Sequence, residues 1–278
     1  MVDAGLVSIV LPSFNGADHI RDSIESCLNQ TYKNIELIVV NDASTDGTLK
    51  IAQDYAARDT RVRIVDNQRN IKLPASLNAG FAQARGVYLT WTSDDNMYRP
   101  DAIAEMVAVL QKEKSDFVYC GYSVTDMKDN LEVTRKPEPA ANIIGTNIVG
   151  ACFLYTQAVK DKIGEYDTNL FCAEDYDYWS RVYRAGFKMT PHDRDLYIYR
   201  RHPKALTTTR SRQICVNTGK VVVKNVRSSG LGPRAKAAIY LDYYRRSAAR
   251  TGRLFCVPYY LRYAICMLDA VAKGDKAA

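Results

Sequence analysis

The stretch VYLTWTSDDN (residues 87–96) decides the fold, because it joins an apolar strand directly to a pair of carboxylates. The apolar run ends at Trp91, and Asp94 and Asp95 follow shortly after it. In open α/β sheets, ligands bind at the carboxyl ends of the strands. Paired carboxylates there suit a hard divalent cation, which takes oxygen ligands and usually shares them with a substrate phosphate.

A second predicted strand ends in the same way. The apolar run at 35–40 is followed by Asn41 and Asp42. Two acidic strand ends in the first hundred residues indicate a nucleotide site rather than a chance arrangement.

The first 120 residues alternate short apolar runs with segments of helical periodicity. The expected strands are residues 7–11, 35–40, 62–65, 87–91 and 117–120. The expected helices between them bury Ile20, Ile24, Cys27 and Leu28, then Leu49, Ala52 and Ala56, then Leu73, Leu77 and Phe81, and finally Ile103, Met106, Val107 and Leu110 after a first-turn Pro100. This alternation predicts βαβ units, and therefore an α/β fold with a mostly parallel sheet flanked by helices.

Beyond residue 120 the pattern is less regular. We expect a hairpin near Leu131–Arg135, strands at 150–155 and 196–199, and a helix at 174–185 that Gly186 closes. Beyond residue 210 the chain reads as helical, with a joint at 230–233.

Composition is that of an ordinary globular protein: 278 residues, 47% of them hydrophobic and 25% charged. No apolar run is long enough to span a bilayer, and the first residues lack the features of a signal peptide. The seven cysteines form no CxxC pair. We therefore expect buried free thiols in a reducing compartment and a cytoplasmic location.

The net charge of +7 hides an asymmetry along the chain. From Arg200 onward, 17 Lys and Arg stand against three Asp, whereas the first 199 residues carry a net charge of −7. Only the basic part invites an anionic partner.

Six fragments, in this order along the chain, resemble glycosyltransferase family 2, the inverting transferases of nucleotide-sugar donors with the GT-A fold. They are VSIVLPSFN (7–15), NDASTDGT (41–48), SDDN (93–96), GEYD (164–167), ED (174–175) and YRRH (199–202). The resemblance covers about residues 6–205. It implies a catalytic domain at 1–209, with a nucleotide-sugar-binding part at about 1–120 and an acceptor-binding part at about 121–209. A basic helical extension at 210–278 follows.

The resemblance also implies which residues contact the donor. The predicted donor-binding residues are Pro12, Ser13, Asn15, Asp42, Lys72, Asn78, Asp94, Arg200 and Arg201. Asp42 can accept the N3–H of uracil, which favours a UDP-sugar, and the two arginines can neutralise phosphates. The alternative for Asp42, together with Ser44 and Asp46, is that it caps the following helix.

Metal and catalytic roles follow from the same resemblance. Asp95 and His202 would bind Mn2+ or Mg2+, which neutralises the charge that grows on the diphosphate leaving group. Asp175 would be the general base that deprotonates the acceptor hydroxyl. Each has an alternative: a solvated capping loop for Asp95, a surface histidine for His202, and complementation of the helix macrodipole for Asp175.

The resulting hypothesis is an inverting, metal-dependent glycosyltransferase that moves one sugar per binding event to a glycan or lipid-linked acceptor, in cell-surface polysaccharide or glycolipid synthesis. One alternative is a nucleotidyltransferase acting on a sugar phosphate, which would be expected to show a glycine-rich loop after the first strand. Another is a non-enzymatic binder of nucleic acid or of an anionic surface through the basic tail. Neither binding role explains the acidic strand ends, and we expect no nucleic-acid partner.

The basic tail interleaves tyrosines and arginines before an apolar run, Leu254–Leu268, that is interrupted by Pro258 and Arg262. The interleaved residues are Tyr240, Tyr243, Tyr244, Arg245, Arg246, Arg250 and Arg253. The run is shorter than the roughly 20 residues that a span requires. Two interpretations remain: a helical pair on an anionic membrane, which would make the protein peripheral on the inner face, or a flank packed on the catalytic domain or at a homodimer contact.

Overall fold

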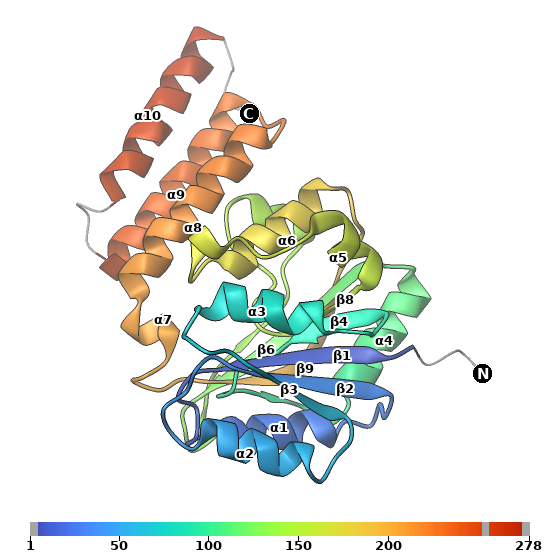
Figure 1. Ribbon diagram of the computed structural model, residues 1–278. Coiled ribbons are helices and arrows are strands. Elements are labelled where there is room, and N and C mark those ends of the chain that lie inside the picture. The colour runs from blue at the N-terminus through green and yellow to red at the C-terminus, as the bar shows by residue number, and fades with distance from the viewer. Residues whose placement is uncertain (1–4, 252–255, 274–278) are drawn as a thin grey trace.

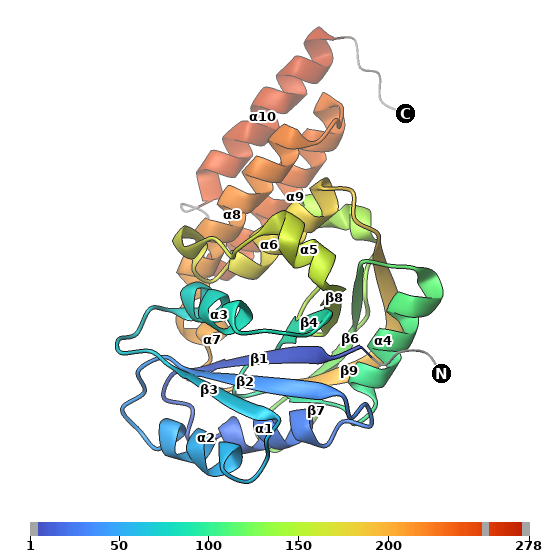
Figure 2. The same cartoon turned by 45° about the vertical axis from the view of Figure 1, so that its right-hand side comes forward.

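A computed structural model describes residues 5–251 and 256–273 (Figure 1). Within these residues, one sheet of nine strands is covered by helices on both faces, and the C-terminal helices project away from it (Figures 1 and 2). Arg253 and Leu254 of the predicted basic tail lie outside the described residues.

The first half of the sheet is parallel, as predicted. It consists of β1 (Val7–Ser13), β2 (Ile35–Asn41), β3 (Val62–Asp66) and β4 (Tyr88–Trp91), in the order β3-β2-β1-β4. Every residue of β1 and β2 is buried, because helices cover both faces of these strands. Parallel pairing brings the carboxyl ends of β1, β2 and β4 to the same edge.

The second half mixes strand directions, so the prediction of a mostly parallel sheet holds only for the first half. Its strands are β8 (Phe153–Thr156), β6 (Phe117–Thr125), β9 (Met189–Arg200), β5 (Met97–Tyr98) and β7 (Leu131–Arg135). β8 runs antiparallel to both β4 and β6, whereas β6 and β9 are parallel. β7 forms the expected hairpin with β6, and β5 adds an antiparallel edge to β9. Of these pairs, only β6–β7 is joined by a short connection, residues 126–130, as an antiparallel hairpin allows.

Helices cover the two faces of the sheet as two layers (Figures 1 and 2). One layer is α1 (Ile20–Leu28), α2 (Thr48–Ala56) and α4 (Ala102–Glu113), and the other is α3 (Leu73–Ala82), α5 (Gln157–Ile163) and α6 (Glu174–Arg184). Two details differ from the prediction. Ile51 rather than Leu49 is the large buried side chain of α2, and Pro100 precedes α4 instead of lying in its first turn. Gly186 follows α6 with a φ of +82°, which suits glycine after a helix end.

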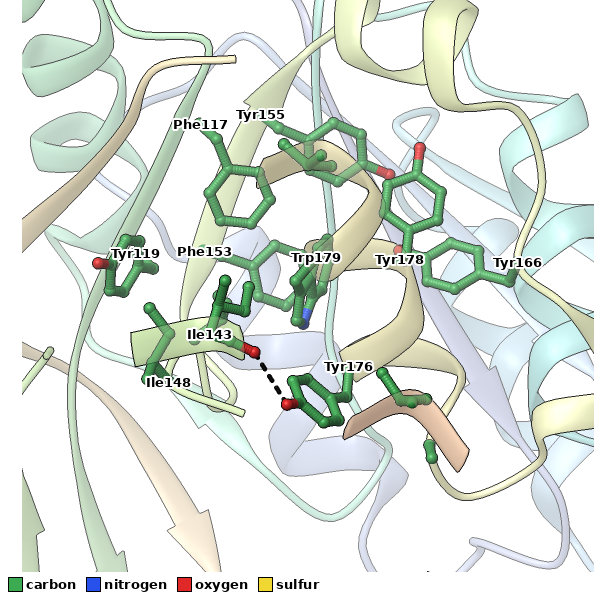
Figure 3. Close-up of a cluster of buried hydrophobic side chains, with 14 of the residues drawn as sticks. Phe117, Tyr119, Ile143, Ile148, Phe153, Tyr155, Tyr166, Tyr176, Tyr178 and Trp179 are labelled. Carbon is green, nitrogen blue, oxygen red and sulfur yellow. Dashed lines mark hydrogen bonds between the residues drawn. The ribbon is translucent and has the colours of Figure 1, made fainter. Parts of the chain in front are cut away.

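A cluster of aromatic side chains anchors α6 to the sheet (Figure 3). Trp179 is completely buried, and its ring centroid lies 4.4 Å from that of Phe153 and 5.0 Å from that of Phe117. The Tyr176 hydroxyl donates a hydrogen bond of 2.8 Å to the carbonyl of Ile143 in the 3-10 helix η1 (Ala140–Ile144). This packing fixes the position of the N-terminus of α6, where the predicted general base lies.

The C-terminal part of the chain is helical, as expected. It comprises α7 (Leu206–Thr209), α8 (Ser211–Ser228), α9 (Pro233–Thr251) and α10 (Val257–Ala272), and the break before Pro233 matches the predicted joint. α8 packs on α6: Val222 belongs to the same buried cluster as Trp179, and Lys224 pairs with Asp177 at 2.9 Å. None of the helices in the described ranges combines the length and apolar character needed to cross a bilayer.

Trp179→Ala should lower the free energy of unfolding by about 3–5 kcal/mol, because it removes the largest side chain of the aromatic cluster and leaves a cavity. Denaturant unfolding monitored by far-UV circular dichroism measures the change. Leu131→Ala is the control, since Leu131 is 63% exposed on β7 and should change stability by no more than about 0.5 kcal/mol. Equal midpoints for the two variants would contradict this account of the core.

Candidate active site

The end of β1 meets the acidic loop that follows β4. The Ser13 hydroxyl donates a hydrogen bond to the carboxylate of Asp94. Gly16 keeps this contact open, because a Cβ atom at that position would collide with the same carboxylate and with Ser13 Oγ. Burial, and after it the charge of Asp95, raises the pKa of Asp94 to about 7. Two carboxylates thus lie close together in a partly buried place, where a positive charge would stabilise their ionised forms.

Asp95 lies next to His202, as predicted from the sequence. Asp95 Oδ2 is 3.0 Å from His202 Nε2, and the two side chains are 18% and 10% exposed. The second oxygen of Asp95, Oδ1, is buried and has no hydrogen-bond partner among the described residues. An unsatisfied carboxylate oxygen beside an imidazole nitrogen fits a divalent cation. Residues 5–251 and 256–273 hold no cluster of three or more His, Cys, Asp or Glu arranged for a metal.

Asp42, at the end of β2, is bonded to β1 and to the loop after β3. Its backbone N–H donates to Ser13 O at 2.9 Å. Oδ1 accepts from Ile71 N at 2.8 Å and from Asn67 Nδ2 at 3.1 Å, and Oδ2 accepts from Lys72 N at 3.0 Å. An ionised carboxylate offers about four acceptor positions. One position on Oδ2 therefore remains for another donor.

Asp46, and not Asp42, bonds to the N-terminus of the following helix, α2. The backbone N–H of Thr48, the first residue of α2, donates to Asp46 Oδ1 at 3.0 Å. Asn15, with a φ of +56°, ties the loop after β1 to the same region, since its Oδ1 accepts from Thr45 N at 2.8 Å. These contacts hold the two loops at the strand ends against each other.

Lys72 adopts an uncommon backbone conformation beside this group. Its φ is +72°, which costs a non-glycine residue free energy, and the hydrogen bond from its N–H to Asp42 helps to hold it there. The Lys72 side chain is exposed, and no carboxylate oxygen in the described part of the chain lies within 4 Å of its ammonium group. The ammonium is therefore available to an anionic ligand.

Two of the predicted donor-binding residues serve the fold: Pro12 is buried, and the partly buried Asn78 bonds to backbone. Pro12 is buried in β1, where it pairs in register with Val40. The Asn78 amide makes both of its bonds with the backbone of Tyr166: it accepts from Tyr166 N at 2.8 Å and donates to Tyr166 O at 2.9 Å. Asn78 therefore ties α3 to the loop before α6, and a donor contact by this side chain stays a prediction.

The two predicted phosphate-binding arginines are paired with carboxylates elsewhere in the chain. Arg200 is largely buried and contacts Asp22 at 2.6 Å and Asp129 at 3.1 Å. Arg201 contacts Glu132 at 2.6 Å. Among the described residues, neither guanidinium forms an ion pair or hydrogen bond with Asp95 or His202. Donor binding by Arg200 and Arg201 therefore also stays a prediction.

Asp175 is half-buried in the first turn of α6 and is held by a neighbouring amide. Asn147 Nδ2 donates to Asp175 Oδ2 at 2.9 Å. Burial raises the pKa of Asp175; burial, followed by the charge of Asp175, raises the pKa of Glu174 to about 8. Protons leave such a pair in coupled steps. Glu174 is almost completely buried, whereas Asp175 is half-buried and accepts from Asn147, so its surroundings favour the ionised form of Asp175 more than that of Glu174.

Tyr199, at the end of β9, responds to the charges of both Asp95 and Asp175. Burial raises the pKa of its phenol, a hydrogen bond with Thr207 lowers it, and the charges of Asp95 and Asp175 raise it. The charges of both carboxylates thus act on one phenol, although the two residues are far apart in the chain.

Sequence reasoning missed Asn147, Asn67 and Tyr199. Asn67 directly follows β3, so the polar strand-end pattern that identified Asp42 and Asp95 could also have found it. Asn147 lies in an irregular segment without periodicity, and only the folded chain brings it to Asp175.

Comparisons with known protein sequences identify relatives. Residues 8–167, more than half of the chain, match the profile described as "Glycosyl transferase family 2". An uncharacterized glycosyltransferase of Rickettsia prowazekii (strain Madrid E) is 34% identical over 200 residues, which cover 68% of this chain and 62% of that protein. The putative glycosyltransferase EpsE of Bacillus subtilis (strain 168) is 33% identical over 189 residues, which cover 66% of this chain and 68% of that protein. The chain thus spans less than two thirds of the length of the Rickettsia relative.

Solved structures show the same fold. S. aureus TarS 1-349 in complex with UDP-GlcNAc aligns with a TM-score of 0.71 and 16% identity, over 92% of this chain and 79% of that one. Mannosyltransferase PcManGT from Pyrobaculum calidifontis, in complex with GDP-Man and Mn2+, aligns with a TM-score of 0.67 and 17% identity, over 96% and 75%. At these identities the likeness is one of fold, and it confirms the predicted GT-A architecture.

Asn147→Ala should raise the apparent pKa of the Glu174–Asp175 pair, because it removes a donor that stabilises ionised Asp175. NMR titration of the carboxyl carbons measures this shift. Asn142→Ala is the matched control: Asn142 donates to exposed Glu138 at 3.0 Å, so its loss should leave the pair unchanged. An unaltered titration of the pair in Asn147→Ala would exclude the positioning role.

Proposed function

The chain belongs to glycosyl transferase family 2, and from this membership we propose that it transfers one sugar from a nucleotide-diphosphate sugar to a hydroxyl acceptor, with inversion at the anomeric carbon. The observation that carries the proposal is the convergence of Asp42, Asp95 and His202 on one edge of the sheet. The charges of Asp95 and Asp175 also both act on the Tyr199 phenol. We propose a UDP-sugar as the donor, because the remaining acceptor position of Asp42 suits the N3–H of uracil.

Asp175 is the proposed general base. It accepts the proton of the acceptor hydroxyl while the hydroxyl oxygen forms a bond to the anomeric carbon. The bond from that carbon to the diphosphate oxygen breaks, and the nucleoside diphosphate leaves. A single displacement of this kind requires one base and no covalent nucleophile. The raised pKa of the buried Glu174 supports this assignment, because the half-buried Asp175, which accepts a hydrogen bond from Asn147, is the member of the pair that ionises more readily.

A divalent cation, Mn2+ or Mg2+, is part of the proposal. We assign it to Asp95 and His202, because the buried and unsatisfied Oδ1 of Asp95 lies beside an imidazole. When bound, such an ion neutralises negative charge on the diphosphate leaving group. The exposed ammonium of Lys72 is a second source of positive charge for the donor. The structure of PcManGT, a relative in fold, contains Mn2+ together with GDP-Man.

We propose that separate parts of the chain bind the donor and the acceptor, as the GT-A fold suggests. We propose that residues 1–120 bind the donor and that residues 121–209 bind the acceptor, a glycan or a lipid-linked glycan of the cell surface. The helical extension beyond residue 209 has 14 Lys and Arg against three Asp. We propose that the protein works on the cytoplasmic side of the cell membrane, where an anionic surface would attract this extension.

A screen of nucleotide sugars tests the proposed function. Thermal unfolding with Mn2+ should show stabilisation by a UDP-sugar, since a ligand that binds only the folded state raises its apparent stability. Incubation of that donor with candidate acceptors should then release free nucleoside diphosphate. Release of pyrophosphate would instead indicate nucleotidyl transfer, and stabilisation by no nucleotide sugar would contradict donor binding.

His202→Ala should weaken Mn2+-dependent binding of UDP by about tenfold or more, because it removes one of two proposed metal ligands. Isothermal titration with and without a chelator measures the effect. His192→Ala is the matched control, because His192 also lies 3.0 Å from a carboxylate, that of Glu105. Equal UDP affinities in the two variants, or binding that ignores the chelator, would contradict the metal assignment.

Asp175→Asn should keep donor affinity and lose turnover by about 10²-fold or more, because the base is gone. Glu174→Gln should retain most of the activity, since glutamine resembles the protonated acid. In the native enzyme, turnover should rise with pH through an apparent pKa above the ordinary value of about 3.9 for Asp, because burial raises the pKa of Asp175. Steady-state kinetics across pH measures all three, and normal turnover by Asp175→Asn would remove the base assignment.

A further inference from the structure

Helix α10 presents an apolar stripe to solvent. Its exposed large side chains are 42–72% accessible: Val257, Tyr260, Leu261, Ile265, Leu268 and Val271. With about 100° of rotation per residue, these positions fall within an arc of roughly 140° on one side of the helix. A surface helix usually turns such a stripe toward the core of its own protein. Here the stripe points outward.

The opposite side of α10 is already used by the fold. Tyr259 meets Tyr243 of α9 edge-on, with ring centroids 4.8 Å apart, and Ala270 is completely buried. The two helices lie side by side and project away from the sheet (Figures 1 and 2). The exposures of its side chains show that no other described segment covers the outward stripe. Contiguous exposed apolar surface of this kind marks an interaction site.

Tyrosines continue the stripe from α10 onto α9, which also carries exposed arginines. Tyr260 lies 5.3 Å from Tyr244 of α9 and 5.6 Å from Tyr263, measured between ring centroids. Arg245 follows Tyr244 in the chain. Arg245 and Arg250 are exposed, and no carboxylate oxygen within the described ranges lies within 4 Å of either guanidinium. The α9–α10 pair thus combines exposed apolar, aromatic and cationic side chains, which suit the acyl chains, the interface and the phosphates of a bilayer.

We propose that α10 lies in the plane of an anionic membrane, with its stripe among the acyl chains and the arginines of α9 against the lipid phosphates. Charge favours this occupant over a second copy of the chain. Pairing two stripes would bring together arginines for which neither copy supplies a carboxylate, and juxtaposed like charges oppose association. Anionic lipids supply the missing negative charge.

The helix lies on the membrane and does not cross it. Its 16 residues extend over about 24 Å, less than the hydrocarbon thickness of about 30 Å. Its inner side also stays packed on α9. This docking surface goes beyond the transfer reaction and does not depend on it.

Sedimentation of the full chain with lipid vesicles tests the proposal. The native protein should bind vesicles of phosphatidylcholine with added phosphatidylglycerol, and should bind phosphatidylcholine alone at least tenfold more weakly. The double variant Leu261→Glu/Leu268→Glu should lose at least tenfold in affinity for the anionic vesicles. The control, Leu131→Glu/Val133→Glu, places the same charges on the exposed strand β7 and should bind like the native protein.

A second variant isolates the charge contribution. Arg245→Ala/Arg250→Ala should reduce the preference for anionic vesicles while leaving far-UV circular dichroism and UDP binding unchanged. Equal vesicle binding by the stripe variant and its control would overturn the proposal, as would binding that ignores lipid charge. A different outcome would assign the surface to a second copy of the chain. In that case the native protein would bind no vesicles, light scattering would show a dimer, and the stripe substitutions would dissociate it.

Discussion

The acidic loop after β4 is attached to two distant parts of the sheet at once, and the proposed site depends on this constraint. Ser13 of β1 holds Asp94, whereas His202, just beyond β9, contacts Asp95. Three strands separate β1 from β9 in the sheet on the path through β4. The acidic loop can reach both strands because the chain continues from it directly into β5. This strand pairs with β9 at Tyr98 and Tyr197. The loop therefore closes a curl in the sheet, and its carboxylates take their places only when the whole sheet has formed.

The two halves of the site rest on different cores. Tyr98 and Tyr197, next to the acidic loop, belong to the buried cluster under α1, α2 and α4. Trp179, which positions the helix of Asp175, belongs to the cluster on the other face of the sheet. A buried carboxylate oxygen without a partner, as in Asp95, costs free energy until a cation or donor satisfies it. Ligand binding should accordingly stabilise the contact between the acidic loop and the segment after β9.

The sequence predicts the parallel half of the fold well, because its strands are continuous apolar runs that end in polar residues. The same rule identifies Ser13, Asp42 and Asp95. It fails for β5 and α5, which are too short for periodicity, and for most of β9, whose half-exposed stretch around Asp193 looks like a loop. Side-chain partners are harder to predict than strands or helices. Arg200 pairs with Asp22 from the opposite end of the catalytic region, and no local sequence pattern predicts this contact.

The central claim is that one cation, shared between Asp95 and His202, joins the protein to a nucleoside diphosphate. Anomalous diffraction at the manganese edge, from crystals grown with Mn2+ and UDP, tests it directly. We expect a single strong peak within coordination distance of both side chains and of the diphosphate, with the uracil ring against Asp42. A manganese peak elsewhere, with Asp95 and His202 still in contact only with each other, would contradict the account.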